Sequence, residues 1–110
     1  MTVGNIIHQL NASPINIADA DREIDGVYIG DLLSWVMGRA KTDNAWITIM
    51  SNINVIAVAT LVDTACVILA EGVTLDDAAI SAAKAKDINI ISTELTAYDA
   101  AIKLSDLLSA

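Results

Sequence analysis

Hydrophobic positions in the second half of the chain fall alternately into short runs and longer, interrupted segments. Short runs rich in β-branched residues begin at Trp46, Cys66 and Ile88, about one βα unit apart. Between them, apolar residues recur at the three- and four-residue spacing of a helix face. The alternation predicts an α/β fold, in which crossover helices pack on a mostly parallel sheet.

Two of the predicted helices have a recognisable beginning. Thr74 and Asp77, and again Thr96 and Asp99, have the spacing of a capping box. We therefore expect Thr74 and Thr96 to cap amphipathic helices. Their apolar stripes are Leu75, Ala78, Ala79, Ala82 and Ala83 in the first and Ala97, Ala100, Ala101, Leu104, Leu107 and Leu108 in the second.

The segment 54–62 carries conflicting signals. Its many β-branched residues favour a strand, and Asp63-Thr64 could then form a hairpin turn. Against this, Ser51 or Asn52 can cap a helix, alanines interrupt the run, and two directly joined strands would break the βα alternation. We therefore predict a buried helix. Because its residues are apolar on all sides, the sheet must cover one side and something else must cover the other.

The first 44 residues are less regular. We expect a short helix near residues 3–10, a turn at 11–14 and an extended pair at 15–17. A strand at 24–29, interrupted by glycine, is followed by Gly30-Asp31, which we expect to cap a helix. No linker or low-complexity segment divides the sequence, so we expect one domain over 1–110.

Composition bears on the partners of this chain. Hydrophobic residues make up 55% and charged residues 18%, which leaves apolar surface in need of cover. We therefore expect a homodimer that buries part of the surface of Trp35, Val36, Met37 and Trp46. The three largest of these, Trp35, Met37 and Trp46, are also possible anchors for another protein, although core packing would equally explain them.

Charge and hydropathy exclude two classes of partner. The formal net charge is −8 and the six basic residues are scattered, which opposes binding to nucleic acid and to anionic lipid. The longest near-apolar run, 55–62, is too short to span a membrane. No secretion signal is visible at the amino end, so we expect a cytoplasmic protein.

The residue types that carry catalysis or bind metals are sparse. Cys66 is the only cysteine and falls in a predicted buried strand, which favours an inert, reduced thiol. His8 has no second histidine or cysteine at metal-ligand spacing, and we expect it at a surface or helix end. No phosphate-binding loop is present and the carboxylates are scattered. We therefore predict no catalytic residues, no metal, no cofactor and no enzymatic activity.

Small and polar residues follow each predicted strand. Because the carboxyl ends of parallel strands lie on one rim, where free N–H groups of helix amino termini meet, we expect a ligand or partner group there. The alternative is that these residues only cap helices and that Glu71 is a solvated loop charge. The candidate binding residues are Ser51, Asn52, Glu71, Gly72, Ser92 and Glu94.

The order of elements and several phrases, from "GVYIGDLL" through "VILAEGVTLDD" to "AYDAAIKL", resemble the DRTGG domain over about residues 24–104. That family's fold is similar to the amino-terminal domain of the kinase/phosphorylase acting on the phosphocarrier protein of sugar transport. Related modules occur in phosphate acetyltransferases and in some pyrophosphatases with CBS domains. There they regulate or dimerise and are not the catalytic part.

The sequence departs from the residues that name this family. Ser51-Asn52 stands where Asp-Arg is expected, and Ala70-Glu71-Gly72 where Thr-Gly-Gly is expected. The missing arginine is the group best suited to a phosphate contact, whereas Glu71 favours a cation, a hydroxyl or an amine. The resemblance thus implies a homodimeric, non-catalytic regulatory or ligand-sensing module. The alternative is an interaction module that docks onto a separate enzyme or kinase.

Overall fold

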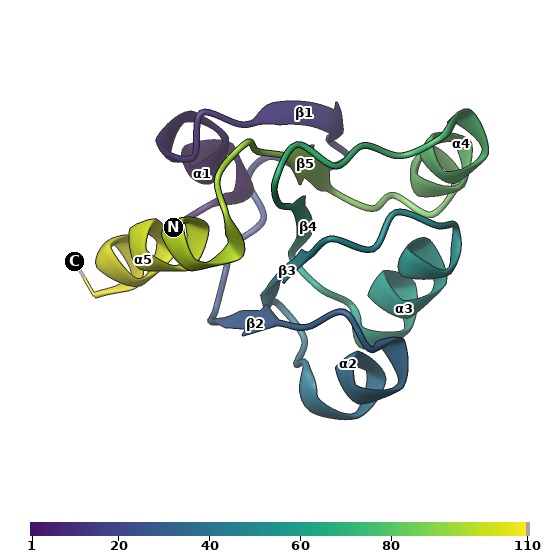
Figure 1. The fold of residues 1–110 in the computed structure, drawn as a ribbon, viewed down its shortest axis with the longest axis horizontal. Coiled ribbons are helices and arrows are strands. Elements are labelled where there is room, and N and C mark those ends of the chain that lie inside the picture. Colours follow the sequence, from purple (N-terminus) through teal and green to yellow (C-terminus); the bar gives the residue numbers. More distant parts are fainter. Residues whose placement is uncertain (110) are drawn as a thin grey trace.

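In the computed structural model, which describes residues 1–109, one five-stranded sheet separates two layers of helices (Figure 1). The strand order is β1-β5-β4-β3-β2; β1 is antiparallel to β5, and all other pairs are parallel. This confirms the predicted α/β class. The elements are α1 (Val3–Gln9), β1 (Ser13–Asn16), β2 (Val27–Ile29), α2 (Leu33–Arg39), β3 (Ala45–Thr48), α3 (Asn54–Val62), β4 (Cys66–Leu69), α4 (Asp77–Ala85), β5 (Ile90–Ser92) and α5 (Ala97–Leu108).

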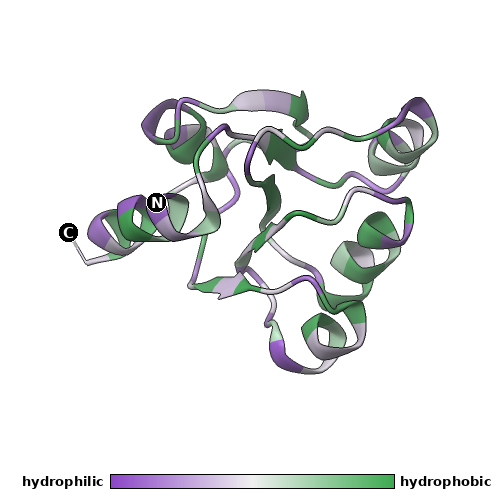
Figure 2. Ribbon diagram, in the orientation of Figure 1, coloured by the Kyte–Doolittle hydropathy of each residue, from purple (hydrophilic) through white to green (hydrophobic). Residues whose placement is uncertain are grey.

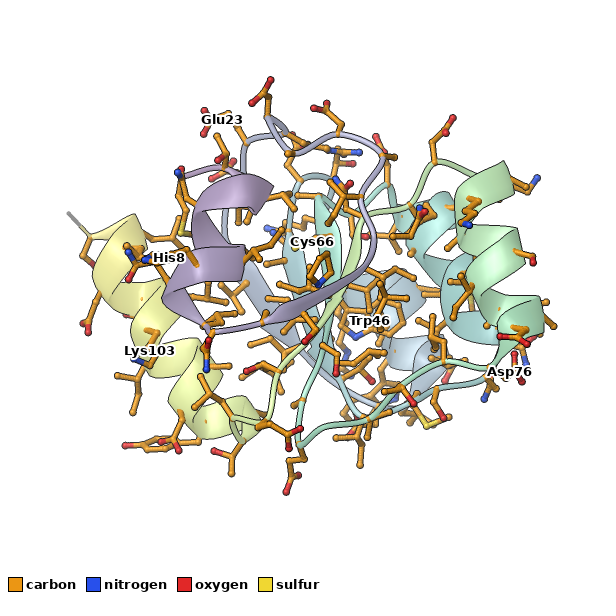
Figure 3. All side chains as sticks on the ribbon, turned by 90° about the horizontal axis from the view of Figure 1, so that it is seen from above. His8, Glu23, Trp46, Cys66, Asp76 and Lys103 are labelled. Carbon is orange, nitrogen blue, oxygen red and sulfur yellow. The ribbon has the colours of Figure 1, made fainter. Side chains whose placement is uncertain are left out.

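The two helix layers follow from the strand order. From β2 to β5 each crossover moves one strand in the same direction, so α2, α3 and α4 all lie on one face of the sheet. The other face is covered by α1 and α5 (Figure 1). Alternate strand residues supply the two cores: Trp46 packs toward α2, α3 and α4, whereas Cys66 and Ile68 pack toward α1 and α5. Figure 3 shows Trp46 and Cys66 inside, with His8 exposed in the last turn of α1 as predicted.

The contested segment is helical, as predicted. In α3, Val55, Ile56, Val58 and Val62 are buried against the sheet and the neighbouring helices, so tertiary packing outweighs their preference for strands. Neither Ser51 nor Asn52 is its cap: the N-cap residue is Ile53, which has no side-chain cap, although the Oδ1 atom of Asn52 accepts a hydrogen bond from the backbone N–H of Asn54 (2.8 Å). The cover expected on the outer side of α3 does not come from residues 1–109, since Leu61 there is 70% exposed.

Of the caps predicted for the other helices, two were wrong and one is confirmed. Helix α4 is capped by Asp76, which accepts from the N–H of Ala79 (2.9 Å), and not by Thr74. Asp31 does not cap α2; its carboxylate accepts from the hydroxyl of Thr48 (2.8 Å) and ties the β2–α2 connection to the end of β3. Thr96 caps α5 as predicted.

The amino-terminal strands also differ from the predictions. The extended backbone predicted at 15–17 is present at Ile15 and Asn16, but the strand that contains them, β1, begins at Ser13 and includes Pro14, so the predicted turn at 11–14 was wrong for its second half. Strand β2 is shorter than predicted, because Gly26 has a φ of +98°, which is outside the extended conformation of a strand.

The predicted dimer surface was wrong for two of its four residues. Val36 and Trp46 are fully buried inside the chain, and the Nε1 atom of Trp46 donates to the carbonyl of Gly30 (2.9 Å). Trp35 and Met37 are exposed on α2, and the guanidinium of Arg39 lies 3.7 Å from the ring centre of Trp35. Among the described residues no helix has both the length and the hydropathy to span a bilayer.

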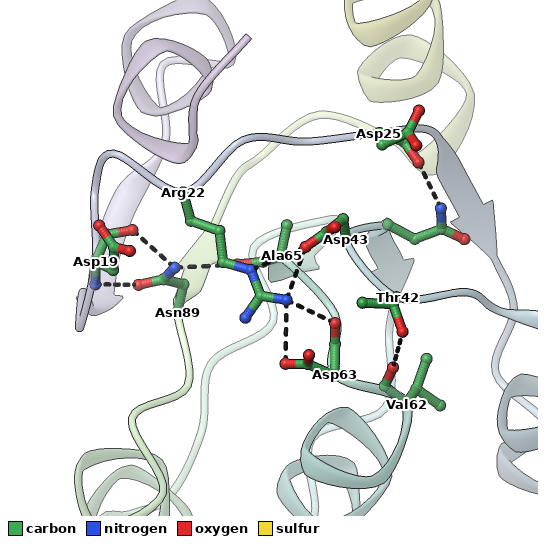
Figure 4. Close-up of polar contacts among 10 residues, drawn as sticks. Asp19, Arg22, Asp25, Thr42, Asp43, Val62, Asp63, Ala65 and Asn89 are labelled. Carbon is green, nitrogen blue, oxygen red and sulfur yellow. Dashed lines mark hydrogen bonds and ion pairs between the residues drawn. The ribbon is translucent and has the colours of Figure 1, made fainter.

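Loops at the amino ends of the strands are tied together by polar side chains (Figure 4). The guanidinium of Arg22 donates to Asp43 (2.9 Å) and pairs with Asp63 (3.0 Å). Partial burial lowers the pKa of Arg22, but these carboxylates outweigh it and the pKa is raised. Asn89, which is 4% exposed, accepts from the N–H groups of Ala18 and Asp19 and donates to the carbonyls of Asp19 and Ala65. The segment before β2 is thereby fixed across the edge opposite the predicted site.

Candidate functional site

The connections that follow β4 and β5 leave the sheet toward opposite faces. The chain passes from β4 to α4 in one helix layer and from β5 to α5 in the other (Figure 1). In open parallel sheets, ligands bind outside the carboxyl ends of the strands where neighbouring connections diverge in this way. The carboxyl ends of β4 and β5 are therefore where a sheet of this kind would be expected to bind a ligand.

Four of the six candidate residues come together at this point. The N–H of Glu71 donates to the carbonyl of Leu95 (2.9 Å), and that of Gly72 to the carbonyl of Thr93 (2.8 Å). The hydroxyl of Ser92 donates to the carbonyl of Val73 (2.7 Å). Because of these bonds the loop after β4, with Glu71 and Gly72, and the loop after β5, with Ser92 and Glu94, form one unit.

Glycine is favoured at position 72 by its backbone conformation, and the lack of a side chain also leaves room for Glu94. The φ of Gly72 is +73°, a left-handed conformation that a Cβ disfavours. A Cβ built on Gly72 would also stand 2.6 Å from Oε2 of Glu94, so the carboxylate of Glu94 occupies the space that a side chain would need. The loop after β5 therefore places an acidic group directly over the backbone of the loop after β4.

Glu71 also has a left-handed backbone, with a φ of +58°. Of the five non-glycine residues with positive φ in the described chain, four are Asn or Asp, which tolerate this conformation well, and Glu71 is the exception. The Thr-Gly-Gly signature of the resembled family has glycine here. The geometry thus favours glycine at 71 as well as 72, and a glutamate at this position is held at a conformational cost.

Ser51 and Asn52 lie at the next strand along. Both are exposed and precede α3, and the side chain of Asn52 accepts a hydrogen bond from the N–H of Asn54, the first residue of that helix. The N–H of Ala70 donates to the carbonyl of Thr48 (3.0 Å), which joins the ends of β3 and β4. The structure therefore gathers Glu71, Gly72, Ser92 and Glu94 tightly, and adds Ser51 and Asn52 as flanking residues with no contact to them among the hydrogen bonds found.

The electrostatic character of this site is acidic. Glu71 and Glu94 are exposed, while the segments 49–54, 70–76 and 92–96 contain no lysine or arginine. Exposed carboxylates can accept hydrogen bonds from hydroxyl or amino groups or neutralise a cation, but a phosphate would find no basic side chain. Within residues 1–109 no group of three or more His, Cys, Asp or Glu side chains is placed to hold a metal ion.

Sequence reasoning missed the apolar residues on the other half of this rim. Ile29 ends β2 and Leu32 follows it, while Ile49 and Ile53 follow β3; each is about half exposed, at 50%, 58%, 46% and 50%. The signal that could have revealed them was their position at or just after the ends of strands, where residues are usually polar. The carboxyl-end rim thus has an apolar half at β2 and β3 and an acidic half at β4 and β5.

The prediction that Cys66 is a buried, unreactive thiol agrees with the structure. Cys66 is free and completely buried. Burial raises the pKa of its thiol to about 12, against the opposing effect of the Arg22 charge. A thiol with so high a pKa is a poor nucleophile at neutral pH.

Comparisons with known proteins yield a match in structure only. No family model and no curated protein sequence matches the chain. A similar solved structure is that of the CBS and DRTGG domains of the regulatory region of Clostridium perfringens pyrophosphatase, complexed with its activator diadenosine tetraphosphate, with a TM-score of 0.73 and 18% identity. The match covers 91% of this chain and 44% of the pyrophosphatase region, so this chain spans less than half of the length of the pyrophosphatase region. At this identity the shared property is the fold, and the chain has the DRTGG-like α/β fold that its sequence predicts.

Proposed function

We propose that this chain is a non-catalytic regulatory module that acts as a homodimer and senses a small metabolite at the carboxyl ends of β4 and β5. The observation that carries the proposal is the convergence of Glu71, Gly72, Ser92 and Glu94 where the two connections diverge. The likeness to the regulatory region of a pyrophosphatase supports a regulatory role. The glutamate at a left-handed position further suggests that its side chain is needed there.

The chemistry of the site narrows the class of ligand. The pyrophosphatase region binds diadenosine tetraphosphate, a polyanion, but the rim of this chain offers two carboxylates and no basic residue. We therefore propose a ligand that presents hydroxyl or amino groups to Glu71 and Glu94. An apolar or aromatic body would then lie toward Ile49 and Ile53.

A series of ligands that differ in phosphate content tests this assignment. Adenosine, AMP and diadenosine tetraphosphate share a base and ribose while their negative charge increases, and spermidine supplies amino groups without a base. Thermal shift and calorimetry should detect adenosine or spermidine and find AMP and diadenosine tetraphosphate weaker, because the carboxylates repel them.

The role of Glu71 is tested with a matched pair of variants. Glu71→Gln removes the charge at the site, whereas Asp106→Asn removes an exposed charge on α5. For a confirmed ligand, Glu71→Gln should lower the affinity at least about tenfold, or ~1.4 kcal/mol, and Asp106→Asn should not. An unchanged affinity in Glu71→Gln would contradict the proposed site.

An alternative function is a protein-interaction module that docks onto a separate enzyme or kinase. The observation that favours it is the exposed pair Trp35 and Met37 on α2, since aromatic and methionine side chains are frequent anchors. Trp46 no longer supports it, because it is buried. For a purified candidate partner, Trp35→Ser should abolish binding measured by calorimetry while Glu71→Gln leaves it unchanged. The opposite result would favour the rim.

A further inference from the structure

The loop after β4 begins with a tight turn whose first central residue is unusual. The turn runs from Ala70 to Val73, and the N–H of Val73 donates to the carbonyl of Ala70 (3.2 Å). Both central residues have a positive φ, +58° at Glu71 and +73° at Gly72, as in a type I′ turn. That turn favours Asn, Asp or Gly at its first central position, and here the residue is glutamate. Figure 2 shows the hydrophobic strand β4 ending in a hydrophilic segment at this point.

The two ends of the turn are fixed by the neighbouring strands. The N–H of Ala70 donates to the carbonyl of Thr48 (3.0 Å), and the carbonyl of Val73 accepts from the hydroxyl of Ser92 (2.7 Å). The side chain of Glu71, in contrast, is exposed, so packing does not hold its backbone in the left-handed conformation. A change of conformation in this loop is therefore confined to the middle of the turn.

A second conformation of the same four residues relieves the strain. In a type II turn the first central residue has a φ of about −60°, which suits glutamate, and the second has a φ of about +80°. Gly72 already has a positive φ, so it fits both turns. Both turns also accept the same hydrogen bond between their end residues, so that Ala70 and Val73 keep their places. The two conformations differ in the dihedral angles of Glu71.

The change at Glu71 breaks the contact between two loops. In the present turn the N–H of Glu71 donates to the carbonyl of Leu95 (2.9 Å), and that of Gly72 to the carbonyl of Thr93 (2.8 Å). The dihedral angles of Glu71 set the angle between these two N–H groups, so both bonds cannot be kept when its φ changes sign. The strain of a left-handed glutamate and the net contribution of one backbone hydrogen bond are similar in size. The two conformations are therefore close in free energy.

We propose that the turn 70–73 is a two-state element, with a strained form that joins the loops after β4 and β5 and a relaxed form that separates them. The first loop leads to α4 and the second to α5, on opposite faces of the sheet, so the turn couples the two helix layers (Figure 1). A ligand that contacts both Glu71 and Glu94 selects the joined form, in which these loops are held together. This sensing role rests on the site proposed above, whereas the existence of the two forms does not.

Relaxation-dispersion NMR of the backbone amides tests the turn without any ligand. Wild type should show microsecond-to-millisecond exchange at residues 70–73 and 93–96, with the relaxed form populated to about 1–10%. Glu71→Gly removes the strain of the joined form and should lower that population about fivefold or more, whereas Glu71→Ala keeps the Cβ and should retain the exchange. The amides next to Asp63 are an internal control and should show no exchange, because aspartate tolerates its left-handed φ of +64°.

The outcomes separate the turn from the ligand site. Flat dispersion profiles in wild type would overturn the two-state turn, and so would exchange of wild-type size in Glu71→Gly. Spermidine, used as the probe for amino groups, should suppress the exchange at saturation. Calorimetric binding of spermidine with unchanged exchange would overturn the sensing role and leave the site standing. If neither spermidine nor adenosine binds, the proposed ligand class and the sensing role fail together, while the variants still decide whether the turn has two forms.

Discussion

Replacing Glu71 with glycine should stabilise the protein. Glu71 has a φ of +58° and an exposed side chain, so its Cβ imposes a cost that few side-chain contacts offset. A left-handed conformation costs a residue with a Cβ about 1–2 kcal/mol. Glycine removes this cost, but it also raises the conformational entropy of the unfolded chain, which lowers the stability by ~0.4–1 kcal/mol. The expected net gain for Glu71→Gly is about 0.5–1 kcal/mol.

Calorimetry can detect a change of this size. For 110 residues, an unfolding entropy of about 2.1 cal/mol/K per residue gives ~0.23 kcal/mol/K. The melting temperature of Glu71→Gly should therefore rise by about 2–4 °C.

Glu71→Ala is the control, since it removes the carboxylate and keeps the Cβ. It should change the stability by no more than about 0.5 kcal/mol. A glycine variant that is no more stable than the alanine variant would refute the reasoning, because the backbone would then store no strain at this position. If the site functions as proposed, both variants should also lose ligand affinity, so that stability and binding change in opposite directions in Glu71→Gly.

Three further changes have defined outcomes. Gly72→Ala should destabilise the protein by about 1–2 kcal/mol in chemical denaturation, because of the left-handed φ of +73°. Asn89→Ala should cost about 2–4 kcal/mol, since it leaves buried donors and acceptors on both sides unpaired; an effect below 1 kcal/mol would show that water replaces the amide. Cys66 should resist a thiol reagent at pH 8 until the protein unfolds. Because its folded pKa of about 12 exceeds the ordinary 9.0, its contribution to stability is complete below pH 9 and declines toward pH 12, a dependence that Cys66→Ala should remove.

The elements of the sheet could be predicted because their signals are local. The runs beginning at Trp46, Cys66 and Ile88 are each bounded by turn residues, and their spacing left room for one helix between strands. That spacing also decided the segment 54–62, where propensity alone favoured a strand. The convergence of Glu71 with Ser92 and Glu94 followed in turn, since parallel strands end on one rim.

Other features depended on contacts that a linear pattern does not contain. Thr74 and Asp76 are both good caps, and the linear pattern does not distinguish them; in the structure the carbonyl of Val73 is bound by Ser92 and α4 is capped by Asp76. Asp31 was assigned to the helix that follows it, but it binds a strand 17 residues away along the chain. Arg22 and Asn89 join segments that are distant in sequence, and the residues next to them in the chain give no sign of these hydrogen bonds.

The two edges of the sheet affect how copies of this chain can assemble. Strand β1 forms one edge and contains Pro14, which has no N–H to offer to an added strand, and β2 forms the other with only three residues. A chain with so much apolar surface would otherwise be exposed to edge-to-edge growth into fibres. Because neither edge readily pairs with a strand of another copy, contacts between copies must form through side chains on the helix layers. Contacts of that kind can close about a symmetry axis, which limits an assembly to a defined number of subunits.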